Sequence, residues 1–328
     1  MRPFDFQRPD SLAHAHELTA PEEATAVAGG TNLLDLMKLQ VETPERLVDI
    51  NRLGMTEIQE TANGGLRIGA LATNTATAND DRVRADYPVL ARAILAGATQ
   101  QLRNRATTGG NLCQRTRCYY FTNIDQPCNK REPGSGCGAI DGIAHLHAVL
   151  GTSPSCIATY PGDMAVALSA LDATVEIASP ENDERAVPVR DFHLLPGDTP
   201  WRENVLERGE IITAVTLPRP VKAKHLYRKV RERSSYAFAL VSVAAIVAVE
   251  DGVIARADLA FGGLAHKPWH DPRLSELLVG EAPSAALFDK AGDLLLEGAR
   301  GYGENDFKIP LARRTLAAVM AEATEIEI

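Results

Sequence analysis

The alternation of apolar and polar positions predicts an N-terminal region built from short α/β units. Asp10 and Ser11 can cap a helix that runs through Leu18. Runs of four or five apolar residues bounded by polar ones indicate buried strands, and an i, i+3, i+4 stripe indicates a helix. The elements expected after the first helix are a strand at 24–28, a helix over 33–39 and a strand at 46–50.

The pattern is interrupted in the middle of the chain. Residues 112–162 show no sustained period and are rich in Cys, Gly, Pro, Arg and Thr. An irregular stretch of this length inside a compact domain usually carries function or is held by something other than an apolar core. Around it we expect strands at 58–61 and 66–68 joined by an Asn63-Gly64 turn, helices at 87–99 and 163–172, a strand at 173–178, a linker at 218–224, strands at 240–249 and 253–261 joined by an Asp251-Gly252 turn, and helices at 283–299 and 309–323.

Composition narrows the class of protein. A chain of 328 residues is long enough for two domains, and 45% apolar with 23% charged residues is ordinary for a globular protein. A net charge of -9 argues against nucleic acid or an anionic membrane as the main partner. No apolar run approaches the roughly 18 residues of a membrane span. The first residues lack the apolar stretch of a secretory signal, so the chain on its own is expected to stay in the cytoplasm.

Two glycine turns are candidates for anion binding. Ala28-Gly29-Gly30-Thr31-Asn32 lies between a predicted strand and a predicted helix, where backbone N–H groups and the helix dipole favour a pyrophosphate. Thr107-Thr108-Gly109-Gly110-Asn111 has the same character, so the two turns could clamp both ends of one elongated anion. Plain loop geometry is the competing interpretation of each turn. The spaced glycines of a Rossmann fold and the P-loop lysine are both missing.

The ordered set of motifs is more specific than any one of them. The two glycine turns, together with Ile68-Gly69-Ala70-Leu71-Ala72-Thr73 and Ala170-Leu171-Asp172-Ala173-Thr174-Val175, resemble the FAD subunit of the xanthine dehydrogenase and carbon monoxide dehydrogenase group. This resemblance implies an α+β fold, with a two-lobed FAD-binding domain of the vanillyl-alcohol-oxidase type followed by a small C-terminal α+β domain. The implied boundaries are 1–218 for the FAD-binding domain (lobe I about 1–60, lobe II about 61–218, insertion about 112–162) and 222–328 for the C-terminal domain.

The resemblance also implies cofactor ligands. Asp163 is expected near the ribityl or ribose hydroxyls of FAD. A basic residue of 227–231, either Arg228 or Lys229, is expected near the isoalloxazine, where a cation would stabilise anionic reduced flavin; a solvated strand edge is the alternative for this segment. The residues implied to hold the pyrophosphate and neighbouring groups are Ala28, Gly29, Gly30, Thr31, Asn32, Leu33, Thr108, Gly109, Gly110 and Asn111.

All five cysteines fall within 44 positions of the irregular stretch, and their odd number favours metal ligation over disulfides. Zinc is one candidate, but zinc sites usually present Cys-x2-4-Cys pairs, and none exists here. Wide spacing with adjacent Gly and Pro favours an iron–sulfur cubane, and free thiols are the plainest alternative. The segment is similar to the FAD subunit of bacterial three-subunit aldehyde oxidoreductases, which implies a 4Fe–4S cluster held by Cys118, Cys128, Cys137 and Cys156. Cys113 is then the odd thiol, unless it replaces one of the four.

The chemistry expected of this chain is electron transfer, with no catalytic residue of its own. His145 and His147 could chelate a metal from a strand, but packing is the favoured interpretation, and no Ser-His-Asp or Cys-His pattern indicates hydrolysis. The resemblance implies a heterotrimer in which a molybdenum-cofactor subunit oxidises an aldehyde and a 2Fe–2S subunit passes electrons to this FAD and on to an external acceptor.

Three questions stay open at this stage. A free-standing flavoprotein oxidoreductase of the same fold is one alternative function, and a zinc-stabilised binding module without flavin is another. The 4Fe–4S cluster can be an electron relay or a structural clasp. Because the electron route that the family implies is complete without this cluster, the clasp is favoured. The subgroup implies periplasmic localisation, by export on the signal of the small partner, with the cytoplasm as the alternative.

Overall fold

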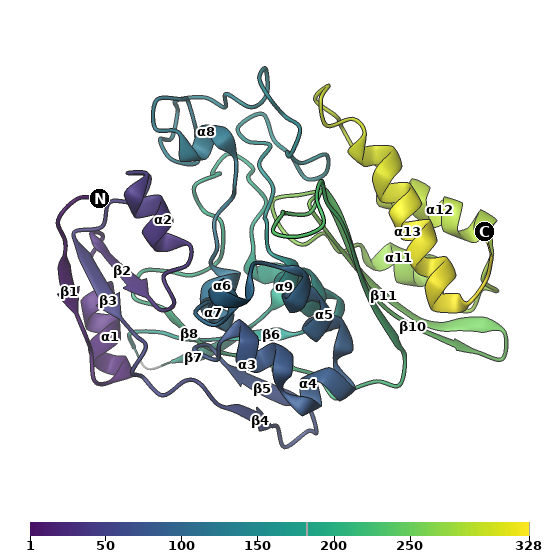
Figure 1. The fold of residues 1–328 in the computed structure, drawn as a ribbon, viewed down its shortest axis with the longest axis horizontal. Helices are drawn as coiled ribbons and strands as arrows, with labels where there is room; N and C mark the ends of the chain where they lie inside the picture. The colour runs from purple at the N-terminus through teal and green to yellow at the C-terminus, as the bar shows by residue number, and fades with distance from the viewer. Residues whose placement is uncertain (182, 328) are drawn as a thin grey trace.

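The N-terminal lobe is a small parallel sheet with a helix on each side (Figure 1). A computed structural model describes residues 1–181 and 183–327. The sheet has the order β1-β3-β2, and both pairings are parallel. Ser11 caps the first helix by accepting a hydrogen bond from the His14 amide at 3.3 Å. The elements of this lobe are β1 (Asp5–Gln7), α1 (Leu12–Thr19), β2 (Ala24–Val27), α2 (Leu33–Lys38) and β3 (Arg46–Asp49).

The second lobe is an antiparallel five-stranded sheet covered by helices on one side (Figure 1). Its order, β4-β5-β8-β6-β7, brings the late strand β8 into the centre. Its strands are β4 (Ile58–Glu60), β5 (Leu66–Gly69), β6 (Thr174–Ala178), β7 (Glu184–Pro188) and β8 (Ile211–Leu217). Its helices are α3 (Asn74–Asn79), α4 (Asp81–Asp86), α5 (Pro88–Ala96), α6 (Gln100–Arg103), α7 (Thr108–Leu112), α9 (Asp163–Ala170) and α10 (Val189–Phe192).

The C-terminal region is a three-stranded antiparallel sheet of order β11-β10-β9. Its central strand is buried on both faces because its side chains alternate between two cores. Ala244 and Ile246 pack with the second lobe, whereas Val243 and Val247 pack with the C-terminal helices. The elements are β9 (Lys224–Val230), β10 (Val241–Glu250), β11 (Val253–Gly262), α11 (Pro272–Leu278), α12 (Ala285–Leu295) and α13 (Lys308–Thr324).

The irregular segment rises between the N-terminal lobe and the C-terminal helices (Figure 1). Between the end of α7 and the start of α9 it contains one short helix, α8 (Tyr119–Thr122), and otherwise turns and isolated bridges. Its interior consists of two small apolar clusters that include cysteines, and it has no layered core among the described residues. The expectation that this stretch is irregular is therefore confirmed.

The apolar pattern located most regular elements to within a few residues, and the predicted α+β class is confirmed. The strands β1, β7 and β8 and the helices α6, α8, α10 and α11 were not predicted, and β9 was expected only as the strand-edge alternative for 227–231. The second glycine turn was expected to be a tight turn, and this was wrong. Thr108–Leu112 forms the short helix α7, with Thr107 as its N-cap. Within the part of the chain that the structure describes, no helix is long and apolar enough to cross a membrane.

Candidate functional site

A large cleft opens where the N-terminal lobe, the second lobe and the loop after β9 meet. It encloses about 1630 Å³, counting its open mouth. Thr31 and Asn32 reach it from the first glycine turn, and Gly110 and Asn111 from the second. The two turns that the sequence singled out, nearly 80 residues apart, are thus brought to one cleft.

The first glycine turn is set by close backbone contact. A Cβ on Gly29 would lie 1.9 Å from the carbonyl oxygen of Arg105, so no other residue fits there without a shift of the backbone. Gly30 has φ +71°, a conformation that glycine adopts without strain. Asn32 accepts a hydrogen bond from the Arg115 amide at 2.9 Å. Its buried Nδ2 has no partner among the described residues, so the amide NH2 of this cleft-lining residue is left unpaired.

The second glycine turn forms the first turn of α7. Thr107 Oγ1 accepts a hydrogen bond from the Gly110 amide at 3.2 Å. Thr108 donates to the carbonyl of Ala72 at 3.1 Å and is buried, and Gly109 packs directly against Ala70. Thr108 and Gly109 therefore shape the turn from inside the lobe. Of the first turn, Ala28 and Leu33 likewise pack into apolar clusters rather than line the cleft.

An acid and two donors meet at the back of the cleft. Lys229 Nζ lies 2.8 Å from Asp163 Oδ2, and the Tyr227 hydroxyl donates to Asp163 Oδ1 at 2.6 Å. Burial, reinforced by the Asp163 carboxylate, raises the pKa of Tyr227 well above its usual value. Tyr227 and Lys229 share one face of β9 because side chains alternate along a strand. Arg228 points the other way and pairs with Glu322 on α13, so Lys229 is the basic residue of this segment that faces the cleft.

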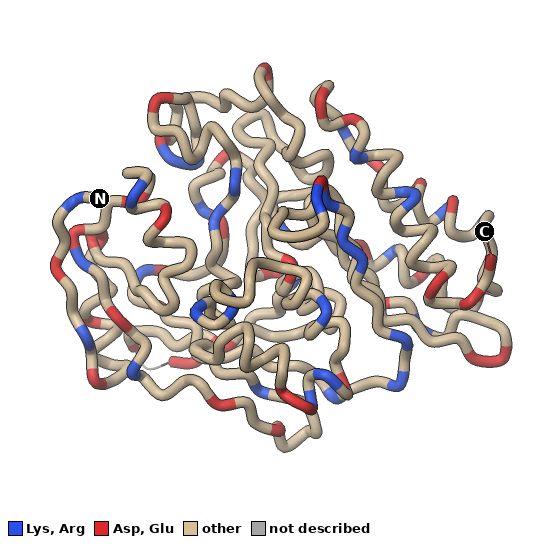
Figure 2. Tube along the Cα trace, viewed as in Figure 1, with Lys and Arg blue, Asp and Glu red and all other residues tan. Residues whose placement is uncertain are grey.

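The cleft suits an elongated anion with polar ends. Although the chain carries a net charge of -9, lysines and arginines follow β9 and the loop after it (Figure 2). Arg103, Arg117 and Arg233 line the cleft beside Lys229, together with the carboxylates of Asp35, Asp163 and Glu232. Asn74 also lines it, and its buried Oδ1 has no partner in the described structure, so that acceptor is free as well as the donor of Asn32. These features fit a dinucleotide with a diphosphate between two polar groups.

The four cysteines chosen from the sequence converge on a second, smaller cavity of about 270 Å³. Cys118, Cys128, Cys137 and Cys156 all line it. Cys128 and Cys137 face each other across an isolated antiparallel bridge. All five cysteines of the chain are free thiols. No three His, Cys, Asp or Glu side chains of the described residues are spaced to enclose one metal ion, so the cavity holds four thiols spread around a common space.

Each sulfur has its own electrostatic surroundings. Burial raises the pKa of Cys118 to about 12, although the amides of Phe121 and Tyr120 oppose this. Cys137 and Cys156 share a hydrogen bond that lowers the pKa of Cys137 and raises that of Cys156. Cys113 packs against the core of the second lobe, and burial raises its pKa to about 12. It does not line the four-cysteine cavity.

A chain of charges that are half-buried at Arg115 and Glu203 and buried at Lys130 joins the cleft to the cysteine cavity. Arg115, whose amide bonds to Asn32, pairs through its guanidinium with Glu42 and Glu203. Glu203 also lies 2.9 Å from Lys130 Nζ, and this lysine, with 1% side-chain exposure, lines the cysteine cavity. Burial alone would raise the pKa of Glu203, but Arg115 and Lys130 outweigh burial and lower it.

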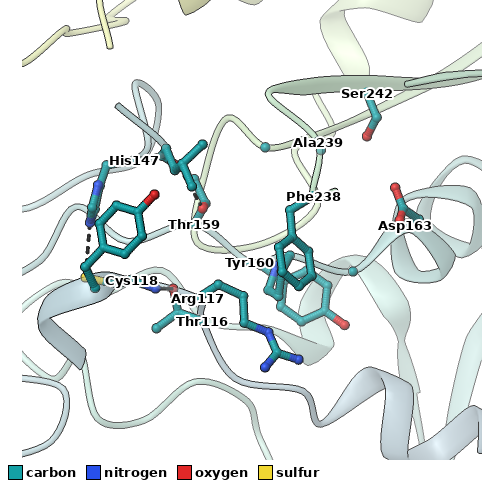
Figure 3. A pocket seen from close by; sticks show the side chains of 16 residues that line it. Thr116, Arg117, Cys118, His147, Thr159, Tyr160, Asp163, Phe238, Ala239 and Ser242 are labelled. Carbon is teal, nitrogen blue, oxygen red and sulfur yellow. Dashed lines mark hydrogen bonds between the residues drawn. The ribbon is translucent and has the colours of Figure 1, made fainter. Parts of the chain in front are cut away.

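A third cavity, of about 540 Å³ when the solvent at its mouth is counted, lies between the cleft and the cysteines (Figure 3). Arg117 and Asp163 line both it and the cleft, and Cys118 lines both it and the cysteine cavity. His147 Nε2 lies 3.1 Å from Cys118 Sγ. Burial lowers the pKa of His147 to about 4, so its imidazole is neutral near pH 7. His145, two residues away, instead pairs with Glu232 at the surface.

Beneath this loop lies a buried ammonium group. Lys308, at the start of α13, donates to the carbonyls of Leu146, His147 and Gly263 at 3.1, 2.9 and 2.8 Å. Asn305 donates to the carbonyls of His147 and Ala148 at 3.3 and 3.1 Å. Burial lowers the pKa of Lys308 to about 7. The C-terminal region thereby fixes the backbone that carries His147.

Several functional positions were missed from the sequence. Asn74, Arg117 and Tyr227 line or support the cleft, but none belongs to a spaced motif. Tyr227 alone had a usable signal, since it stands two residues before Lys229 and so shares its face of a strand. His147 was assigned to packing, whereas the structure places its ring on a cysteine sulfur.

Comparisons with known proteins agree with this geometry. Residues 2–220 match the sequence family described as "FAD binding domain in molybdopterin dehydrogenase", and residues 225–323 match the "CO dehydrogenase flavoprotein C-terminal domain". The chain is 53% identical over 328 residues to the aldehyde oxidoreductase FAD-binding subunit PaoB of Escherichia coli (strain K12), covering 98% of this chain and 99% of that protein. It is 27% identical to the carbon monoxide dehydrogenase medium chain of Afipia carboxidovorans, covering 97% and 93%.

Solved structures show the same fold. Reconstituted CO dehydrogenase from Oligotropha carboxidovorans superposes with a TM-score of 0.76 at 26% identity, over 100% of both chains. Quinoline 2-oxidoreductase from Pseudomonas putida 86 superposes with a TM-score of 0.75 at 26% identity, over 99% of this chain and 98% of that one. The similarity therefore extends over both the cleft and the C-terminal region.

Proposed function

Since the chain belongs to the family of FAD-binding subunits of molybdopterin dehydrogenases, we propose that it is the electron-transfer subunit of a molybdenum-containing aldehyde oxidoreductase. The observation that carries this proposal is the convergence of both glycine turns on one cleft with three arginines in its lining, in a chain 53% identical to an aldehyde oxidoreductase FAD subunit. Purification of the native complex tests it. The expected result is one FAD per chain and aldehyde-dependent bleaching of the flavin absorption. A flavin that stays oxidised with every aldehyde, yet is reduced by dithionite, would contradict the assignment.

Bound FAD supplies the chemistry of accepting electrons singly and releasing them in pairs. The residues of this chain hold and bias it. Asn32, Gly110 and Asn111 present polar groups at the turns, and Lys229 provides a buried cation toward the cleft. A fixed cation favours an anionic reduced ring over a neutral oxidised one. Nothing in this arrangement acts as an acid, base or nucleophile on an aldehyde.

The four-cysteine cavity is proposed to hold a 4Fe–4S cluster. Three features support this. Four thiols line one space, amide groups approach their sulfurs, and the buried ammonium of Lys130 offsets negative charge. Single-ion zinc would bring four sulfurs to about 2.3 Å from one centre, and the described residues have no such grouping. A cubane spreads its thiolates farther apart. Iron, sulfide and zinc analysis of the purified protein separates the two sites, and bound zinc without iron would overturn the cluster.

The role proposed for the cluster is that of a clasp. The loop that carries the cysteines has little regular structure and only small apolar clusters, so it lacks a core of its own. Four metal–thiolate bonds can replace such a core. A clasp predicts that cluster loss lowers stability and flavin content more than it slows electron transfer in molecules that stay intact.

The partners proposed are a molybdenum-cofactor subunit and a subunit with 2Fe–2S clusters, in a heterotrimer that delivers electrons to an external acceptor. The relatives and solved structures named above support this, because the chain matches one component of such enzymes over nearly its full length. Co-purification from the native organism tests the assembly, and a chain that elutes alone with full oxidase activity would instead be a free-standing flavoprotein.

Periplasmic localisation is proposed to follow from export with the small iron–sulfur partner. The resemblance to three-subunit aldehyde oxidoreductases supports this. Fractionation of cells with and without the signal segment of that partner tests it. If this chain still reached the periplasm when the partner lacked its signal segment, export by the partner would be rejected.

A further inference from the structure

We propose that His147 donates a hydrogen bond to the Cys118 thiolate and thereby raises the reduction potential of the iron–sulfur cluster. This inference rests on the cluster proposed above, but concerns a residue outside the four ligands. It assigns His147 as a positioning residue that acts through Cys118.

The direction of the hydrogen bond follows from the chemistry of the two groups. His147 Nε2 lies 3.1 Å from Cys118 Sγ, within hydrogen-bond distance for sulfur. A cysteine that ligates iron is a thiolate and has no proton to give. The imidazole must therefore carry its proton on Nε2 and donate it. The other ring nitrogen, Nδ1, is buried and has no partner in the described part of the chain, so no second hydrogen bond competes for the tautomer.

The backbone that carries the ring is held in place by the C-terminal region. Lys308 and Asn305 both donate to the carbonyl of His147, and each also donates to a neighbouring carbonyl of the same loop. All these groups are buried. Such anchoring keeps a hydrogen bond to a metal ligand in constant geometry, which is the usual role of a group that orients a ligand.

Cys118 is the cysteine on the side of the third cavity, which adjoins the cleft. It alone among the five cysteines lines both the cysteine cavity and the cavity that leads toward Asp163 (Figure 3). Arg117, the residue before it, already lines the cleft. Backbone amides approach the sulfurs of Cys118, Cys137 and Cys156 alike, and the charge of Lys130 acts on Cys156. His147 therefore acts on the cluster ligand on the side of the third cavity.

A donor to a ligating sulfur withdraws electron density and stabilises the reduced, more negative cluster. Because this hydrogen bond exists in both oxidation states, the midpoint shifts only by the difference in its strength between them; a hydrogen bond to a charged group contributes about 1.5 kcal/mol in all, so about tenfold in the equilibrium constant for cluster reduction is the upper limit. For one electron, tenfold corresponds to about 59 mV. Removal of the donor should lower the midpoint by up to this amount.

Redox titration of the purified complex, followed by the electron paramagnetic resonance signal of the reduced 4Fe–4S cluster, tests this. His147→Phe fills the same space without a donor, and we expect its midpoint to fall while four irons and one FAD per chain are retained. His147→Gln places an amide N–H near the position of Nε2 and should restore part of the shift. His145→Phe, on the same loop but bonded to Glu232 at the surface, is the matched control and should leave the midpoint unchanged.

The outcomes are distinct. A midpoint in His147→Phe equal to that of the wild type, with iron retained, overturns the inference and leaves the cluster proposal intact. Wild-type protein without iron overturns the cluster proposal itself. If His147→Phe loses iron, His147→Asn carries the same prediction, since its shorter amide does not reach the sulfur. Loss of iron from both variants, with retention in His145→Phe, overturns the tuning role in favour of a purely structural one.

Discussion

Lys229 on β9 and Asp163 at the first turn of α9 form a buried ion pair at 2.8 Å, with side-chain exposures of 4% and 9%. The pair joins the C-terminal sheet to the second lobe at the back of the cleft. Lys229 also donates to the carbonyl of Ala96 at 3.2 Å. A buried carboxylate is stable there because an ammonium, a tyrosine hydroxyl and the N-terminal end of a helix all favour its charge.

Replacement of Lys229 by methionine should destabilise the protein by about 3 kcal/mol, because it leaves Asp163 buried without its counter-ion. It should also lower the midpoint potential of bound flavin, since a cation near the reduced ring is lost. Urea denaturation and a flavin redox titration measure the two effects. Arg228→Met is the matched control: its partner Glu322 is 47% exposed, so the change should cost less than about 1 kcal/mol and leave the flavin unaltered. Equal effects from the two variants would contradict this account of the cleft.

Gly29→Ala should reduce flavin content severely. The added methyl would stand 1.9 Å from the carbonyl oxygen of Arg105, so the first glycine turn must move away from Arg105 and lose its present position at the cleft. The ratio of flavin to protein absorbance in purified samples measures the loss. Gly298→Ala is the control, because nothing lies within 4 Å of its Cβ and only its φ of +71° is strained. Gly298→Ala should lose about 1 kcal/mol of stability and keep its flavin. A Gly29→Ala protein with its full content of bound flavin would refute the role of the turn.

Cys137→Ser should remove iron and lower the thermal midpoint together with flavin content. Serine is a poor ligand for iron, and the irregular loop then loses its proposed clasp. Cys113→Ala should retain all four irons, because Cys113 packs in the core of the second lobe away from the cysteine cavity. Iron analysis and electron transfer per remaining flavin are the measurements. Normal stability with electron transfer abolished in Cys137→Ser would favour a relay over a clasp.

Glu203→Gln should destabilise the chain by about 3 kcal/mol, because Arg115 and the buried Lys130 both lose their counter-charge. The wild-type stabilisation also depends on pH. The folded-state pKa of Glu203 is lowered, so its contribution is present above the pKa of an unfolded glutamate, about 4.3, and is lost as pH falls through the folded-state value. Urea midpoints between pH 7 and pH 3 should therefore converge for wild type and variant at the acid end.

A surface pair provides the control for this experiment. Glu207 pairs with Arg202 and has 70% side-chain exposure, so Glu207→Gln should change stability by less than about 1 kcal/mol at every pH. A difference between wild type and Glu203→Gln that is constant from pH 7 to pH 3 would show that the lowered pKa of Glu203 contributes nothing to folding.

The apolar cores and most of the turns could be predicted from the sequence, but the long-range polar contacts could not. Strands such as β10 and β11 were predictable because their apolar runs report burial directly. The strand β7 was not, since its burial pattern alternates over exposed residues such as Glu184. The second glycine turn became a helix because Thr107 caps it, a local signal that was available and not used.

The cleft was predictable from glycine spacing and resemblance, but its charges were not. Nothing local distinguishes Lys229 from Arg228 until the strand direction is fixed, since the choice depends on which face of β9 meets Asp163. The link from Arg115 through Glu203 to Lys130 spans 88 residues of sequence, and only the folded chain brings those groups together. The four cysteines were chosen correctly as a group that shares one cavity, whereas their iron remains a prediction.

The buried ammonium of Lys308 makes the two matched family regions inseparable. Lys308 belongs to the C-terminal region, yet two of its three acceptors, the carbonyls of Leu146 and His147, belong to the insertion in the FAD-binding region. A chimera that paired residues 1–220 with a C-terminal region lacking this lysine would leave the carbonyls of Leu146 and His147 with only the donors Thr159 and Asn305, and the loss of the charged donor should cost about 1 kcal/mol for each. Recombination at the linker is therefore constrained: the two regions must be exchanged as a matched pair, even though the peptide between them is a simple connection.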